Sequence, residues 1–173
     1  MTKAARRRLV VETPAAVAPE VGPWLWALDD CRHRTLTVLE GLSDAHVDRA
    51  GVDGATIGTL LYHIALIESS WLYEDILAQP FPEVEAYFPQ AVRDANGRLQ
   101  PVTGQTLAEH LRRLEAIRAV LREHLSRMTG DDLARVRRLP EYDVSPGWVL
   151  HHLLQHEAEH RGAIAALAGR AAD

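Results

Sequence analysis

Histidine is the residue type in this chain whose number and spacing point most directly to chemistry. The chain has nine histidines, and four of them lie between positions 151 and 160. His156 and His160 are four residues apart, so on a helix they would share one face, with Cβ atoms about 5–6 Å apart. Two neutral imidazoles placed in this way can bind one metal ion at about 2.0–2.1 Å, and imidazole suits zinc, nickel and iron. The spacing therefore predicts a metal site on this segment.

An alternative interpretation is that these two rings are buried and hydrogen-bonded to neighbours. Burying a polar ring without a partner costs about 1–3 kcal/mol, and a shared cation would satisfy both rings, so we favour the metal. A complete site needs a third ligand from another helix. His63 is the best candidate, because it lies at the margin of an apolar stripe beside Ile64 and Ile67. His110 or His124 would take its place if the helix faces align differently.

Polar residues around the histidine pair are candidates for supporting roles. His152 precedes His156 by one helical turn, at the edge of the same face, and would face the substrate or support the ligands. Glu157 lies towards the apolar side and is placed to orient a ligand histidine through its free ring nitrogen. Glu159 is expected to face solvent. Arg161 would either receive an anionic group of a substrate or form a surface salt bridge.

Other conspicuous side chains have simpler interpretations. Glu68 lies inside an apolar stripe, so we expect it to pair with an arginine or to approach the site. Trp71 and Trp148 are expected to be core anchors, with pocket lining as the alternative. Cys31 is expected to be a small core residue rather than a nucleophile. The histidines expected in solvent are His33, His46 and His151.

Four segments with helical periodicity must position these residues, and none shows the alternation of a β-strand. One of them begins at Thr106, which forms a predicted capping box with Glu109, and another begins at Ser145 followed by Pro146. The segments run from about 23 to 42, from about 56 to 78, from 106 to just before Gly130, and from 145 to about Gly169. They predict an all-α four-helix bundle, in which residues 79–105 form a long crossover loop between helices 2 and 3.

Length and composition favour a single globular domain. The chain has 173 residues, within the usual range of about 100–200 for one domain, and we expect the bundle to occupy residues 21–173 after an extended or flexible arm at 1–20. No apolar stretch reaches the roughly 18–20 residues of a membrane span. The net charge of −5 gives no support to nucleic-acid binding. The single cysteine excludes an internal disulfide and favours a cytoplasmic location.

Two of the helical segments resemble a known family. TIGTLLYHIALIESSWLYEDIL is similar to the second helix of the DinB/YfiT-like superfamily, and SPGWVLHHLLQHEAEHRGAIAAL, with its H-x-x-x-H-R-G ending, is similar to the fourth. The resemblance covers most of residues 20–170 in helix order. It implies a four-helix bundle in which a divalent metal is held by three histidines, matching His63, His156 and His160. Relatives include mycothiol- or bacillithiol-dependent transferases and maleylpyruvate isomerase, and homodimers are common among them.

The resemblance and the residues together predict a metal-dependent enzyme that transfers a low-molecular-weight thiol to an electrophile. The metal would lower the pKa of the thiol, and the loop at residues 79–105 would shape the substrate pocket. Within enzymes the alternative is metal-assisted hydrolysis, with Glu157 or His152 relaying protons. Outside enzymes, the alternative is a metal-binding stress-response protein without turnover. The expected partner is a small-molecule substrate, with a homodimer as a possible assembly.

Overall fold

Four long helices are the largest elements of the protein. The computed structural model describes residues 9–51, 54–82, 84–91, 93, 97 and 100–169. The long helices are α1 (Gly22–Leu39), α3 (Ile57–Ser70), α5 (Leu107–Leu125) and α7 (Pro146–Leu167). A π-helix, η1 (Trp71–Leu77), continues α3 without a break. This mainly helical structure confirms the predicted all-α class.

Shorter elements occur in the connections between the long helices. They are α2 (Asp44–Val47), α4 (Val84–Tyr87), α6 (Gly130–Ala134), and the strands β1 (Arg137–Arg138) and β2 (Asp143–Val144). The two strands pair antiparallel, and they close a turn in which the Leu139 N–H donates to the Tyr142 carbonyl at 2.9 Å. This ribbon was not predicted from the sequence, because two-residue strands are too short to show alternation.

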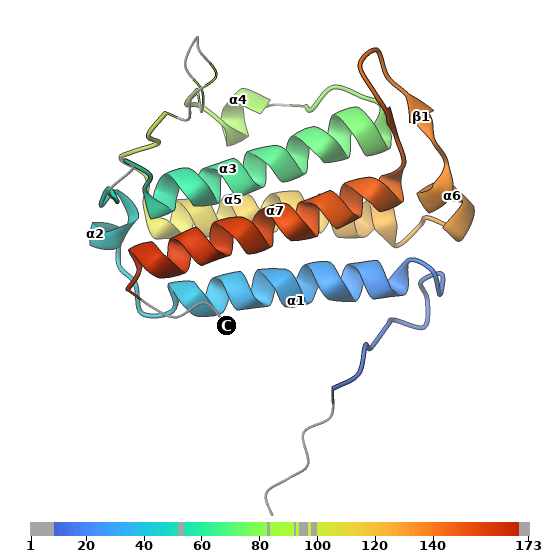
Figure 1. Cartoon of the computed structure of the whole chain (residues 1–173), viewed down its shortest axis with the longest axis horizontal. Helices are drawn as coiled ribbons and strands as arrows, with labels where there is room; N and C mark the ends of the chain where they lie inside the picture. The colour runs from blue at the N-terminus through green and yellow to red at the C-terminus, as the bar shows by residue number, and fades with distance from the viewer. Residues whose placement is uncertain are drawn as a thin grey trace, which may run out of the picture.

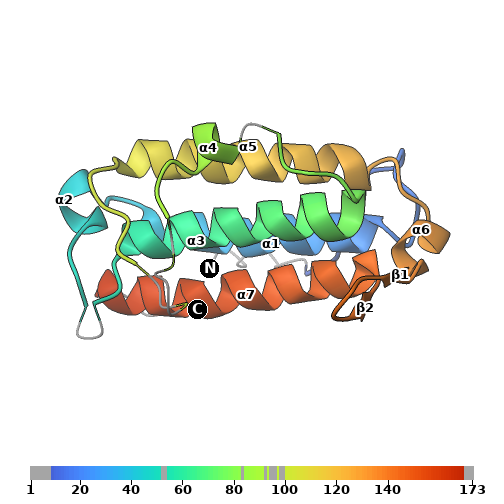
Figure 2. The same ribbon diagram turned by 90° about the horizontal axis from the view of Figure 1, so that it is seen from above.

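The long helices lie side by side (Figures 1 and 2). Helix α1 packs against α7, and α3 packs against both α5 and α7. Figure 1 shows that α3 and α7 run in opposite directions, whereas α3 and α5 run in the same direction. Because α3 and α7 are antiparallel, the start of α3 lies beside the end of α7, and η1 lies beside the start of α7.

Local signals set the ends of the helices much as the sequence indicates. The Thr106 hydroxyl accepts from the Glu109 N–H at 3.2 Å, and the Glu109 carboxylate accepts from the Thr106 N–H at 2.7 Å, which confirms the capping box. The Ser145 hydroxyl accepts from the Trp148 N–H at 3.3 Å. Beyond α7, Gly169 adopts a φ of +69°, a left-handed conformation that favours glycine.

Two helices end earlier than the sequence predicts. Helix α1 ends at Leu39, before the predicted end at about 42. Helix α5 ends at Leu125, and Thr129 then caps a separate short helix that begins at Gly130.

The apolar core forms two clusters, one towards each end of the long helices. One cluster contains Leu61, Ile64 and Ile117 among its buried members, and the other contains Leu28 and Leu150. No helix in the described part of the chain is long and apolar enough to span a membrane. Of the predicted N-terminal arm, residues 9–13 form neither helix nor strand, and residues 1–8 lie outside the described residues.

Candidate metal centre

Three histidine rings from α3 and α7 meet between the two helices. The Nε2 atom of His156 lies 3.2 Å from Nε2 of His63 and 3.1 Å from Nε2 of His160. One ring nitrogen of each residue lies within 4.8 Å of those of the other two. His63 is buried, and the other two are half-buried. The three residues predicted from the sequence to form one site are therefore together in the structure.

The antiparallel packing of α3 on α7 brings these rings together. His156 and His160 occupy successive turns of α7, with ring centroids 4.5 Å apart. His63 projects from α3 between them, with its ring centroid 4.9 Å from that of His156 and 5.0 Å from that of His160. The three rings are steeply inclined to one another, so the nitrogens converge edge to edge and the rings do not stack.

The donor geometry of the three rings fits a single cation. Ligand nitrogens at about 2.0–2.1 Å from a tetrahedral metal lie about 3.3 Å from one another, close to the observed 3.1 and 3.2 Å. In a neutral imidazole, each ring nitrogen carries either one N–H or one lone pair. The Nε2 atom of His156 therefore cannot form a good hydrogen bond with both neighbouring nitrogens at once. A cation at the centre would satisfy all three lone pairs.

Burial keeps these rings in the form that binds metals. Desolvation, followed by the neighbouring His160, lowers the pKa of His63 to about 4. Desolvation, followed by the neighbouring histidines, lowers the pKa of His156 to about 3, and the pKa of His160 is also lowered by burial. The rings are therefore neutral at neutral pH, and metal binding does not have to displace protons from them. The Nδ1 atom of His63 is buried without a hydrogen-bond partner in the described part of the chain.

His152 stands between this histidine cluster and two tryptophans. Its ring centroid lies 5.9 Å from that of His156. On its other side, its ring stacks on Trp148 with a centroid distance of 5.3 Å and an interplanar angle of 7°, and its centroid lies 4.9 Å from that of Trp71. His152 is thus a neighbour of the three histidines and is not a member of their group.

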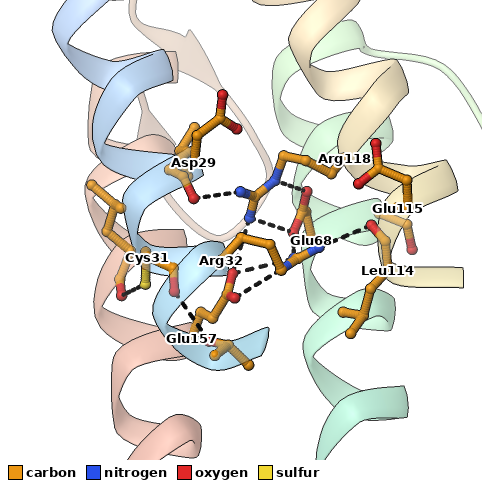
Figure 3. A network of polar contacts seen from close by, with 12 residues as sticks. Asp29, Cys31, Arg32, Glu68, Leu114, Glu115, Arg118 and Glu157 are labelled. Carbon is orange, nitrogen blue, oxygen red and sulfur yellow. Dashed lines mark hydrogen bonds and ion pairs between the residues drawn. The ribbon is translucent and has the colours of Figure 1, made fainter. Parts of the chain in front are cut away.

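Glu157 belongs to a buried network of four charged residues, one from each long helix (Figure 3). Its carboxylate accepts from Arg32 Nε at 2.7 Å and from Arg118 Nη2 at 2.9 Å. Glu68 accepts from Arg32 Nη2 at 2.8 Å and from Arg118 Nε at 2.7 Å. Burial raises the pKa of Glu157, but the two guanidinium groups outweigh it, so the net pKa is lowered and the carboxylate is ionised. Within the described residues no hydrogen bond joins Glu157 to the three clustered histidines, and its carboxylate binds the two arginines instead.

The arginines of this network are the residues that the sequence interpretation missed. The pairing of Glu68 with arginine was predicted and is confirmed. Arg118 carries a recognisable signal, since it follows Leu114 by four residues and precedes Leu121 by three, which places it inside the apolar stripe of α5. Arg32 follows Leu28 by four in the same way. A charged residue in such a position needs a buried partner of opposite charge.

The remaining histidines lie elsewhere. His110 is buried, with its Nδ1 3.2 Å from Arg113 Nη1, and His124 borders a separate cavity near Met128. Neither replaces His63 in the cluster. His33 and His151 are exposed as predicted, while His46 is half-buried and takes part in the capping of α2.

The surroundings of Cys31, Arg161 and the two tryptophans can be compared with the roles predicted for them. Cys31 is buried, as predicted for a core residue, and its Sγ lies 3.6 Å from Arg161 Nη1. Arg161 forms no ion pair with any described residue, which excludes the predicted surface salt bridge for this part of the chain. Trp148 is 50% exposed and lines a cavity with Trp71, so the alternative role of the two tryptophans as pocket residues holds, and the core role of Trp148 is wrong.

The fold and the site together define a helical protein with an internal cluster of three histidines suited to a metal ion. The family model of the DinB superfamily matches residues 27–164, which include the three histidines and all four residues of the charged network. The chain belongs to the DinB superfamily. A comparison with curated proteins found no match.

Proposed function

We propose that this protein is a metal-dependent enzyme that transfers a low-molecular-weight thiol, of the mycothiol or bacillithiol type, to an electrophilic small molecule. The observation that carries the proposal is the convergence of the His63, His156 and His160 nitrogens between α3 and α7. We also propose that the four long helices form a DinB-like bundle in which residues 79–105 cross over. The parallel direction of α3 and α5 supports this topology.

The proposed roles follow from the positions of the side chains. His63, His156 and His160 would hold a divalent ion such as zinc, nickel or iron. When bound, the ion would supply Lewis-acid chemistry that lowers the pKa of a thiol. Three protein ligands leave a coordination position for another molecule, as in catalytic metal sites. His152, beside the cluster, is placed to exchange a proton with a molecule bound there.

Metal content tests the site assignment. Purified protein should contain about one equivalent of a divalent metal by elemental analysis, and we expect His63→Ala, His156→Ala or His160→Ala to lose most of it while the helical circular dichroism persists. His151→Ala is the matched control, because His151 lies on the same helix but is exposed. Unchanged metal content in the three cluster variants would remove the assignment.

A thiol-dependence assay separates the proposed activity from its alternatives. The protein is incubated with an electrophile and with mycothiol or bacillithiol, and consumption of the electrophile is followed. We expect consumption to need the thiol, to stop after chelation and to return with added metal. Hydrolysis of a substrate without thiol would favour a metal-assisted hydrolase. Stoichiometric metal with neither activity would favour a metal-binding stress-response protein. Homodimerisation and a cytoplasmic location stay predictions.

A further inference from the structure

An aromatic cavity lies next to the histidine cluster, at the end of the helices where α7 begins. Its volume is about 580 Å³, within the range of roughly 300–1,000 Å³ that is usual for small-molecule sites. It is lined by Trp71 of η1, by Tyr142, Asp143 and Val144 of the β-ribbon region, and by Trp148 of α7. Segments far apart in the sequence therefore build it together, around the corner where η1, the ribbon and α7 meet (Figure 1).

Three aromatic rings are grouped closely enough to act on one ligand. The ring centroid of Trp71 lies 5.9 Å from that of Tyr142 and 5.4 Å from that of Trp148. The rings are tilted at 42° and 50° and do not stack tightly on one another. A cation within about 6 Å of an aromatic centroid is attracted by the negative face of the ring. At these spacings, one small group can lie within that distance of all three rings.

Asp143 is the charged residue in the described lining of this aromatic cavity. Asp143 lines the cavity, and no described residue lining it carries a positive charge. The Tyr142 hydroxyl donates to Asp75 Oδ1 at 3.0 Å, and Glu74 and Glu141 also act electrostatically on Tyr142. The guanidinium of Arg137, at the start of the β-ribbon, donates to the backbone carbonyls of Glu74 and Asp75.

Asp143 has no ion-pair partner among the described residues. The register places it opposite Arg138 in the β-ribbon, but no ion pair joins the two side chains. The cavity therefore combines aromatic side chains with a carboxylate that forms no ion pair in the described part of the chain.

We propose that this cavity binds an organic cation with apolar substituents, of the trimethylammonium type. The aromatic rings would contact the alkyl groups and the delocalised charge, and Asp143 would supply the counter-charge at the rim. A compact ammonium ion is less suitable, because its strong hydration must be removed. A neutral apolar group is less suitable, because it gains nothing from the carboxylates.

The cavity and the histidine cluster share one helix face, with His152 between them. The ring of His152 stacks on Trp148 and adjoins His156. A molecule with its cationic group in the cavity would thus extend towards the histidines. That the cation is part of the substrate rests on the proposed function. The binding itself does not, because none of the three clustered histidines lines the cavity.

The test compares choline with its neutral carbon isostere, 3,3-dimethylbutan-1-ol. The two probes have nearly the same shape, and each gives one strong methyl signal, so saturation-transfer NMR follows both under the same conditions at low salt. We expect choline to bind saturably in the millimolar range or tighter, and the isostere to bind at least tenfold more weakly. Equal binding of the two probes, or no binding of choline up to tens of millimolar, would overturn the proposal.

Variants locate the binding in the cavity. Trp148→Leu and Asp143→Asn alter exposed residues, so both proteins should stay folded. We expect the first to weaken choline binding at least fivefold and the second at least threefold. Trp26→Phe on α1 is the control and should bind as the unchanged protein does. Unaltered binding in both cavity variants would overturn the proposal.

One further variant separates this inference from the proposed function. His156→Ala should bind choline normally whether or not it has lost metal. If this variant loses metal-dependent activity but still binds choline, the cation site is supported independently of the proposed function. If the unchanged protein does not bind choline, the cation site is refuted and the metal site is unaffected.

Discussion

Replacing Glu157 by glutamine tests the role that the structure gives to this residue. The side chains of Arg32, Glu68, Arg118 and Glu157 are each at most 4% exposed, and their two positive and two negative charges balance. Glu157→Gln keeps the shape but leaves one buried positive charge uncompensated. Breaking a buried ion pair in this way costs about 3–5 kcal/mol.

Such a loss would be a large part of the stability of the protein. A domain usually has a free energy of unfolding of about 5–15 kcal/mol, and for a chain of this length each kcal/mol shifts the Tm by about 2–4 °C. We therefore expect the Tm of Glu157→Gln to fall by about 6–20 °C. Urea unfolding followed by circular dichroism measures the free energy directly. Glu159→Gln, two residues away and exposed, is the control and should change it by less than about 0.5 kcal/mol.

A double-mutant cycle shows whether charge balance is the cause. Arg118→Met removes a positive charge, so in the Glu157→Gln background it restores neutrality. We expect the double variant to lose at least about 1 kcal/mol less than the sum of the single losses. A Glu157→Gln protein within about 1 kcal/mol of the unchanged protein would refute the reasoning. A stable but inactive variant would return Glu157 to the catalytic role expected from the sequence.

Two other predictions concern the packing of α2, α3 and α5. Burial, reinforced by the Arg113 guanidinium, lowers the pKa of His110 to about 4. Between pH 6.5 and 4 the unfolded chain therefore binds a proton there that the folded protein does not, and stability falls by up to about 3 kcal/mol as the pH drops. The free energy of unfolding, measured with urea, should lose this pH dependence in His110→Gln and keep it in the exposed His33→Gln. Parallel pH profiles for the unchanged protein and both variants would contradict the prediction. A Cβ atom at Gly58 would lie 2.7 Å from Val47 Cγ1, so Gly58→Ala should lower the Tm, at a cost of about 1–3 kcal/mol. Gly162→Ala, with open space around it, should leave the Tm unchanged or raise it, and equal shifts in the two variants would count against the close approach.

Local patterns in the sequence determined the long helices and two of the three clustered histidines. Helix periodicity and capping residues act over a few neighbouring positions, so they could be read directly, as with Ser145 before α7. The pairing of His156 with His160 follows from the pitch of one helix. Local patterns could not by themselves decide between His63 and His110 as the third ligand. The family resemblance also pointed to His63.

The tertiary structure alone decided how separate helices meet. The antiparallel packing of α3 on α7 places His63 against the histidine pair and Trp71 against His152. The buried network needs one residue from each of four helices, and both arginines form their ion pairs with residues of other helices. The aromatic cavity also needs the β-ribbon, whose two-residue strands are too short to leave a periodic pattern. Side-chain spacing along one chain segment fixes which face a residue occupies, but only the docking of helices fixes what that face touches.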